Sequence, residues 1–525
     1  METNGESIRE ERLKIYKEAT ESILRQLKDI QKTFSTGSPK DKKDLELSLA
    51  NVSANLKKQL NTNVGDIYIF KTKKYVKYLE NYFIPQNYEV IFTYRLNFFK
   101  VLVDSGFINN EEAGNLFNNL VQIRKRQIGD QWGAKKKISI PPNFLEFEYF
   151  GQFNEILEGI FKEEQEKIAK MQPELEKAWK EFSVLFNKID FPSMGLHNVR
   201  LAMYGSSQNA FKTAGSDIDF TLLTGCYIDE RLLLKIIKEY FDEFIKEKLI
   251  EIKVEKTDNN TVRIPHLQFK YKSFEFDLTV NNIFGVVNTR LLDAYAALDA
   301  RCQKLGVLVK IWAKNNGICN GQDFLSSYCY IILVIAFLQN LKEPILPCLQ
   351  KIVDPVITPI KRVLDNDTQD IQEVNFAFEE DTLKAKRSIR GFRNEDLSLA
   401  KLFLLFVIWL EELTKSNEDT ISIKNGCLLP REETYQSVTG DMNKNPNNFV
   451  LSVEDPFDKT HDLGKNFRKN NNVKMSSNGK DSNKSEENRE RFVGVLKETR
   501  QLVQKYCEGN LTQIQLSKVF RKNSL

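Results

Sequence analysis

The stretch that decides the fold is YGSSQNAFKTAGSDIDFTLLT, residues 204–224. An apolar segment enters a turn at Gly205 and Ser206, and Asp217 follows that serine by eleven residues (217 − 206). Because side chains alternate along a strand, Asp217 and Asp219 face one side while their apolar neighbours face a core. Two adjacent carboxylates repel each other unless a cation neutralises them. The segment therefore predicts a strand that presents two carboxylates to a hard divalent cation.

A second alternating segment supplies a third carboxylate. FEFDLTV, residues 274–280, places Asp277 opposite its apolar side chains. If this strand lies beside the first, Asp277 completes a site with Asp217 and Asp219 that can hold two Mg²⁺ or Mn²⁺ ions roughly 3.5–4 Å apart. The glycine of the turn lets the backbone approach a phosphate, whose oxygens can bind the turn's N–H groups and serine hydroxyl. A pair of aspartates alone is also typical of a solvated or calcium-binding strand end. The combination favours metal-dependent phosphate chemistry.

The composition is that of a globular protein with several domains. Its 525 residues exceed one ordinary core and predict roughly two to four domains. Hydrophobic residues make up 41% and aromatic residues 11%, which is enough to bury sizeable cores and excludes a disordered chain. The formal net charge of +4 neither requires nor excludes nucleic acid, so a phosphate-binding surface has to be local.

Cysteine spacing and hydropathy bear on the compartment. The seven cysteines are scattered without a CxxC pair, which argues against a disulfide framework or a zinc site and favours a reducing, intracellular setting, cytoplasmic or nuclear. The N-terminal residues lack the apolar core of a signal peptide. The longest apolar runs, residues 330–338 and 402–410, are too short to cross a bilayer and predict buried helices, so we expect no membrane partner.

Patterns along the chain predict an α+β protein in three regions. Residues 1–160 carry helical patterns without a catalytic constellation, and residues 165–305 alternate strands and helices after a first helix over 165–187. Residues 306–510 are mainly helical, and a stretch rich in Asn, Ser and Lys predicts a disordered loop at about 465–490.

The first region suggests a docking role. Basic residues surround Trp132 between Arg124 and Lys137, a pattern that can contact RNA, although a solvated loop is the alternative. We expect this long helical region to dock a protein partner or RNA.

The carboxylate motifs resemble those of the nucleotidyltransferase superfamily that includes DNA polymerase beta. Its pattern of hG[GS], DhDh and hDh is matched by YGS, DIDF and FDL. The resemblance implies a five-stranded mixed sheet flanked by helices, with Asp217, Asp219 and Asp277 as ligands of Mg²⁺ or Mn²⁺.

Three later segments narrow the resemblance. They look like terminal uridylyltransferases and their noncanonical poly(A) polymerase relatives, in which a helical central (poly(A)-polymerase-associated) domain packs against the catalytic domain and the nucleotide binds between them. The segments are VNNIFGVVNTRLLDAYAALDARCQKLGVLVKIWAKNNGI (280–318), FLSSYCYIILVIAFLQ (324–339) and LSVEDPFDKTHDLGKNF (451–467).

The family's motifs imply phosphate and base contacts on two of the predicted helices. Lys310 and Lys314 are four residues apart, share a helix face and would bind the triphosphate as point charges; an exposed helix face is the alternative. Ser327 would hydrogen-bond phosphate. Tyr328 would stack on the base, with core packing as the alternative. Gly205 and Ser206 would complete the phosphate site.

Further motif residues would recognise the nucleoside. Asn288 and Thr289 would contact ribose and base, and Asn282 would contact the ribose 2′ hydroxyl. Asp455 would sense the base edge. His461, six residues later (461 − 455), occupies the position where family members that use UTP contact the uracil carbonyl and exclude adenine.

These residues predict a template-independent RNA nucleotidyltransferase that adds uridylate from UTP to an RNA 3′ end with release of pyrophosphate. A poly(A) polymerase that uses ATP with the same chemistry is the alternative. A catalytically inactive scaffold that binds RNA or protein is a further one.

Overall fold

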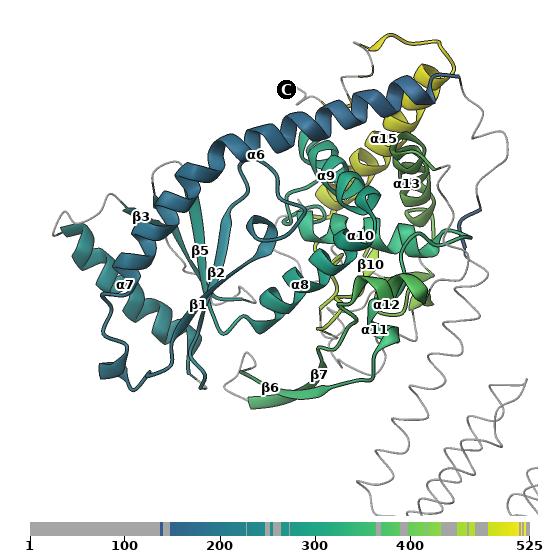
Figure 1. The fold of residues 1–525 in the computed structure, drawn as a ribbon. Coiled ribbons are helices and arrows are strands. Elements are labelled where there is room, and N and C mark those ends of the chain that lie inside the picture. The colour runs from purple at the N-terminus through teal and green to yellow at the C-terminus, as the bar shows by residue number, and fades with distance from the viewer. Residues whose placement is uncertain are drawn as a thin grey trace, which may run out of the picture. The chain divides into compact units, whose positions relative to one another are not determined.

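The computed structural model describes residues 137–139, 148–226, 228–246, 252–255, 264–271, 274–363, 369–388, 397–416, 418–431, 449–458, 461–467, 481–513, 516 and 519–520. A five-stranded mixed sheet with its helices stands beside a second, mainly helical part (Figure 1). The predicted α+β class is thus confirmed.

The predicted N-terminal helices lie outside the described residues, as does the basic segment around Trp132 except for its last residue, Lys137. This lysine does not extend into solvent, because its ammonium donates to the carbonyl of Gln339 at 2.8 Å. Burial lowers the pKa of Lys137, and Ile138 bridges to Leu341 beside it. Lys137 therefore ties the start of the described chain to the helical part.

The sheet has the order β1-β2-β5-β4-β3. Its strands are β1 (Arg200–Tyr204), β2 (Ile218–Leu223), β3 (Ile252–Glu255), β4 (His266–Tyr271) and β5 (Phe274–Val280). Strands β2 and β5 run parallel, and the other neighbouring pairs are antiparallel. In β5 the predicted alternation holds, because Phe274, Phe276 and Leu278 are buried while Asp277 lies on the opposite side.

Two helices cover the sheet, α6 (Phe150–Phe186) and α7 (Glu230–Lys246). Phe182 of α6 stacks on Phe276 of β5 and on Phe241 of α7, with ring centroids 5.1 and 5.6 Å apart. The helix predicted over 165–187 is confirmed and begins earlier, at Phe150. Its first half packs in the helical core and its second half in the sheet core, so α6 runs along both parts (Figure 1).

The second part is built from helices around a large apolar core. They are α8 (Ile283–Leu298), α9 (Ala300–Asn315), α10 (Ser327–Asn340), α11 (Leu349–Ile352), α12 (Thr382–Arg387), α13 (Leu399–Leu413) and α15 (Asp481–Cys507). The two apolar runs form α10 and α13, whose side chains are mostly buried, as predicted. Among the described residues, every helix is too short or too polar to cross a bilayer.

Strands in the helical part were not predicted. Two form a hairpin, β6 (Ile357–Val363) and β7 (Gln369–Asn375), and three form a small sheet, β8 (Asp419–Ser422), β9 (Cys427–Pro430) and β10 (Ser452–Val453). The β8–β9 turn carries Asn425-Gly426, with Gly426 at a positive φ of 61°. Asn-Gly between apolar segments is a hairpin signal, so this turn was detectable in the sequence.

The disordered loop predicted at 465–490 is wrong over residues 465–467, which end in the buried Phe467, and over residues 481–490, which belong to α15. Its middle, residues 468–480, lies outside the described residues. Polar composition suggested disorder, but the segment 481–490 also pairs Glu486 with Arg489 at 3.0 Å, one helical turn apart. It continues into the rest of α15, where buried side chains such as Phe492 and Leu496 anchor the helix. The seven cysteines are all free thiols.

Candidate active site

Two of the predicted carboxylates are neighbours across parallel strands. Asp219 of β2 lies directly opposite Asp277 of β5 in the register of the sheet. Asp217 was predicted to lie on the same strand, but it precedes β2 by one residue, and its side chain is exposed. The sheet therefore brings together the strands of the two segments, as the three-carboxylate prediction requires.

Burial, together with the charges of nearby carboxylates, raises the pKa of all three aspartates. Burial raises the pKa of Asp219 to about 7, and the charges of Asp277 and Asp217 add to this effect. The pKa of Asp277 is raised mainly by burial, and Gln268, its partner on β4, opposes the shift through a hydrogen bond. Loss of hydration also raises the pKa of the more open Asp217. Carboxylates held in this way favour a neighbouring cation.

The Gly-Ser turn lies against Asp219. Gly205 begins the short 3₁₀ helix η4 (Gly205–Ser207) with a positive φ of 75°, a conformation that only glycine adopts easily. A Cβ atom on Gly205 would lie 2.1 Å from Oδ2 of Asp219. Ser206 follows in the same turn and is half-buried. Glycine is therefore required both by the turn and by the approach of the turn to the carboxylate.

Helix α8 is hydrogen-bonded to this turn. The amide of Gly205 donates to Oγ1 of Thr289 at 2.8 Å, and that hydroxyl donates to the carbonyl of Gly285 at 2.8 Å. Asn282 caps the start of α8 by accepting from the amide of Gly285 at 3.0 Å. The carbonyl oxygen Oδ1 of Asn288 is buried and lacks a partner among the described residues. Asn288 is thus the member of this group that offers an unused polar atom.

The two predicted lysines differ in their surroundings. Lys310 is 2% exposed, and its ammonium donates to the carbonyl of Phe211 at 3.2 Å. Burial lowers the pKa of Lys310 to about 8, and the charge of Lys314 adds to the shift. Lys314 is exposed one helical turn further along α9. Both charges act on the carboxylate of Asp217, so the prediction that they share a face toward the site agrees with the structure.

The start of α10 lies next to the lysines. The hydroxyl of Ser327 lies 3.3 Å from Sγ of Cys319, whose thiol interacts electrostatically with Lys310 and Lys314. The ring of Tyr328 packs at the edge of the helical core, while its buried hydroxyl has no partner among the residues that the structure describes. The predicted stacking residue is thus partly a core residue.

Asp455 and His461 contact each other. Nδ1 of His461 lies 3.4 Å from Oδ2 of Asp455. The other carboxylate oxygen of Asp455 accepts from the amides of Phe457 and Asp458, both at 3.0 Å. The charge of Asp455 also acts on Tyr328, which places this loop beside the start of α10. Asp455 therefore orients the histidine ring and closes the loop that carries it.

We call residues 455–461 the base loop. A buried polar network joins the residues on either side of this loop. Asp462 is 5% exposed and accepts from the Ser452 hydroxyl at 2.7 Å and from the Val453 and Gly464 amides at 3.1 and 2.7 Å. These bonds hold the two ends of the base loop together. Sequence reasoning missed Asp462, although the carboxylate directly follows His461.

The carboxylates fit a divalent ion that brings some of its own ligands. Oδ1 of Asp277 is buried and lacks a hydrogen-bond partner in the described structure, as expected for an oxygen reserved for a cation. Among the described residues, no three His, Cys, Asp or Glu side chains converge tightly enough to enclose a metal by themselves. Mg²⁺ usually takes one or two carboxylates together with water and phosphate oxygens, so an open site suits it.

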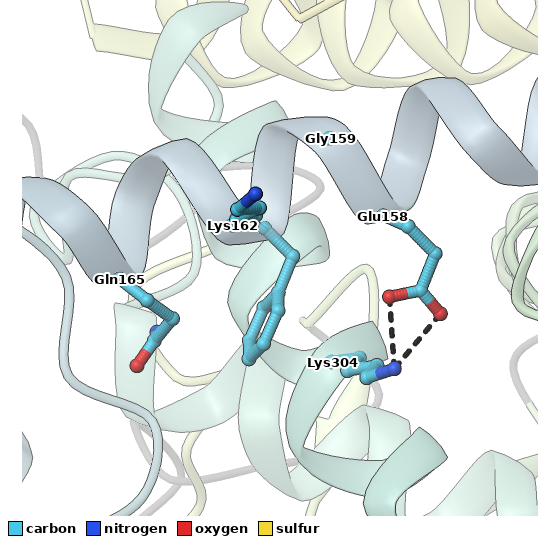
Figure 2. A pocket seen from close by; sticks show the side chains of 6 residues that line it. Glu158, Gly159, Lys162, Gln165 and Lys304 are labelled. Atoms are coloured by element: carbon cyan, nitrogen blue, oxygen red, sulfur yellow. Dashed lines mark hydrogen bonds and ion pairs between the residues drawn. The ribbon is translucent and has the colours of Figure 1, made fainter.

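A separate cavity of about 420 Å³ lies between α6 and α9, away from the carboxylates. Figure 2 shows Lys304 of α9 reaching Glu158 of α6 there, with both carboxylate oxygens 2.8 Å from its ammonium. Gln165 also lines it, and none of the predicted site residues does. This cavity plays no part in the site.

Comparisons with known proteins agree with this geometry. The family model described as "Poly(A) RNA polymerase, mitochondrial-like, central palm domain" matches residues 158–297. Terminal uridylyltransferase 4 of Mus musculus is 31% identical over 274 residues, covering 50% of this chain and 15% of that protein. The chain is thus similar to a poly(A) RNA polymerase palm domain and to a terminal uridylyltransferase, each over part of its length.

A poly(A) RNA polymerase is about equally similar. Poly(A) RNA polymerase GLD2-B of Xenopus laevis is 30% identical over 268 residues, covering 49% of this chain and 47% of that protein. The chain thus spans less than half the length of these two relatives. A solved cytoplasmic RNA terminal U-transferase shares the fold, with a TM-score of 0.50 and 21% identity over 71% of this chain and 98% of that one.

Proposed function

We propose that the protein is a template-independent RNA nucleotidyltransferase that transfers uridylate from UTP to an RNA 3′ end. The observation that carries the proposal is the pairing of Asp219 with Asp277 across β2 and β5, beside a glycine turn. The RNA 3′ oxygen forms a bond to the α-phosphorus of UTP, and the bond from that phosphorus to the bridging oxygen breaks. Pyrophosphate leaves, and the hydroxyl proton passes to solvent.

The carboxylates would hold Mg²⁺, which activates the 3′ hydroxyl and neutralises charge on the triphosphate. Asp219 and Asp277 supply adjacent oxygens, and Asp217 adds an exposed one. A related structure of the same fold, the Cid1 poly(U) polymerase, is described as bound to MgGTP. We propose Mg²⁺ or Mn²⁺ as the ion here.

The surrounding residues would bind the triphosphate and the ribose. Lys314 is exposed and carries its charge toward Asp217, so we propose it as the principal phosphate-binding cation. The Ser206 hydroxyl, in the turn that begins at Gly205, would contact a phosphate oxygen. The unused Oδ1 of Asn288 suits a ribose hydroxyl, which is a hydrogen-bond donor.

Base choice would rest on the base loop. His461 is held by Asp455, so its ring has one orientation at the edge of the nucleotide site. An imidazole N–H suits the O4 carbonyl of uracil, where adenine presents an amino group instead. Tyr328 would stack on the base. The poly(A) polymerase alternative keeps the same chemistry, and the similarity to GLD2 proteins keeps it as the second candidate.

Incubation of the purified protein with a short RNA, Mg²⁺ and each NTP separately tests the proposal. We expect extension with UTP to exceed that with ATP by about tenfold or more, the scale of one good base contact. His461→Ala should reduce this ratio, whereas His197→Ala, an exposed turn residue, should not. A preference for ATP would replace the proposal with the poly(A) polymerase, and no extension with any NTP would favour an inactive scaffold.

A further inference from the structure

One loop of the sheet part belongs by its packing to the helical core. We call it the latch loop, residues 209–216, between the Gly-Ser turn and Asp217. Its Phe211 is 1% exposed and lies in the apolar cluster of the helical part, while the residues of β2 that follow pack in the aromatic cluster of the sheet. The latch loop therefore crosses from one core to the other just before the catalytic carboxylates.

A glycine on α9 makes room for this crossing. A Cβ atom on Gly306 would lie 2.5 Å from the Phe211 ring and 3.1 Å from Cδ1 of Ile331. Such a short contact cannot form unless the ring or the helix shifts, so even one methyl group at this position would disturb the packing of Phe211.

Polar bonds fasten the same loop to α8 and α9. The amide of Ala210 donates to Oδ1 of Asp293 at 2.8 Å, and its carbonyl accepts from Nε2 of Gln303 at 3.0 Å. The carbonyl of Phe211 accepts from the buried Lys310 ammonium at 3.2 Å. Three side chains of the helical part thus bind two successive residues of the loop.

Helix α6 holds the other end of the latch loop. Oε1 of Glu164, which is 8% exposed, accepts from the amide of Ala214 at 2.6 Å. The ammonium of Lys212 donates to Oε1 of Gln172 at 3.0 Å. Inside the loop, the amide of Ser216 donates to the carbonyl of Thr213 at 3.1 Å, so the last turn before Asp217 is closed.

The position of Asp217 depends on this fastening. Asp219 is held by the ladders of β1 and β5, but Asp217 lies one residue before β2 and its side chain is exposed. No strand pairing therefore places it, and the latch loop is the segment that does. We propose that Glu164 and Phe211 are positioning residues, which set Asp217 relative to Asp219 and Lys310 through the latch loop.

This inference rests on the proposed function and is tested on the full chain with Glu164→Ala, Glu164→Gln and Glu158→Ala. Glutamine keeps an oxygen that can accept from Ala214, and Glu158 joins α6 to α9 through Lys304 without touching the latch loop. The kcat and KM for UTP, the Mg²⁺ affinity by calorimetry and the melting temperature are measured for each protein.

Glu164→Ala should lower kcat about 10- to 100-fold, the range for loss of a hydrogen bond to a charged group, with KM for UTP changed by less than about threefold. It should also weaken Mg²⁺ binding. Glu164→Gln should restore both, and Glu158→Ala should match the wild type. If Glu164→Ala lowers only the melting temperature, or if Glu158→Ala has the same effect on kcat, the positioning role is refuted.

A second set of variants tests the Phe211 contact from the opposite side. Gly306→Ala should lower kcat and Mg²⁺ affinity, and its penalty should be smaller in a Phe211→Leu background, because the shorter side chain leaves space for the methyl group. Additive penalties would overturn the role of Phe211. Wild-type protein that binds Mg²⁺ but extends no RNA would refute the proposed function alone. The positioning role of the latch loop would still be tested by the Mg²⁺ affinities of the same variants, measured by calorimetry.

Discussion

Gly205→Ala is expected to abolish catalysis without unfolding the protein. The added Cβ would lie 2.1 Å from Oδ2 of Asp219, whereas ordinary contact begins at 3.4 Å. The carboxylate must therefore retreat by about 1.3 Å (3.4 − 2.1), and a misplacement of about 1 Å in a catalytic group can cost about 100-fold in rate. We expect at least that loss in kcat.

Gly195→Ala provides the matched control. Gly195 has a φ of 77°, close to the 75° of Gly205, and a Cβ there would meet no atom within 4 Å. Both substitutions impose the left-handed strain of about 1–2 kcal/mol on the free energy of unfolding. Only Gly205→Ala also displaces Asp219, the carboxylate that we propose as a metal ligand.

The assay is UTP-dependent extension of a short RNA, with stability measured by urea denaturation of the same preparations. Gly195→Ala should lose stability and keep its kcat. Near wild-type activity in folded Gly205→Ala would refute the reasoning, and so would an equal loss of activity in Gly195→Ala.

Three further predictions concern charge. Lys314→Ala should raise KM for UTP by about tenfold or more with a smaller change in kcat, measured by steady-state kinetics; an unchanged KM would exclude it as a phosphate ligand. Burial and nearby charges raise the pKa of Asp219 from 3.8 unfolded to about 7 folded, so the metal-free protein should lose stability as pH rises between these values. The gain in melting temperature on adding Mg²⁺ should therefore be larger at pH 8 than at pH 6, and equal gains would contradict this account. Asp462→Ala removes the acceptor of three buried hydrogen-bond donors. It should lower the free energy of unfolding by about 2 kcal/mol or more in urea titrations, and it should also lower the ratio of RNA extension with UTP to that with ATP. An unaltered ratio would show that the base loop does not depend on Asp462.

The sequence alone determined the strands of the five-stranded sheet and the carboxylates that they bring to it. The alternation around Asp219 and Asp277 is a local pattern, because side chains point to opposite faces of every strand. The buried helices α10 and α13 were likewise readable from continuous apolar runs. The Asn-Gly turn at Asn425 was equally local and could have been used to predict the β8–β9 hairpin.

The tertiary structure alone decided which predicted residues share a site and what each one contacts. The register that sets Asp219 opposite Asp277 joins positions 58 residues apart (277 − 219), and no local pattern specifies it. Spacing made Lys310 and Lys314 equivalent, but packing buried the first and exposed the second. Nothing in the sequence around Phe211 indicates that it is buried, whereas in the structure it packs against Gly306 in the core of the helical part. Such contacts depend on how distant segments fill shared space, and that is a property of the packed chain rather than of neighbouring residues.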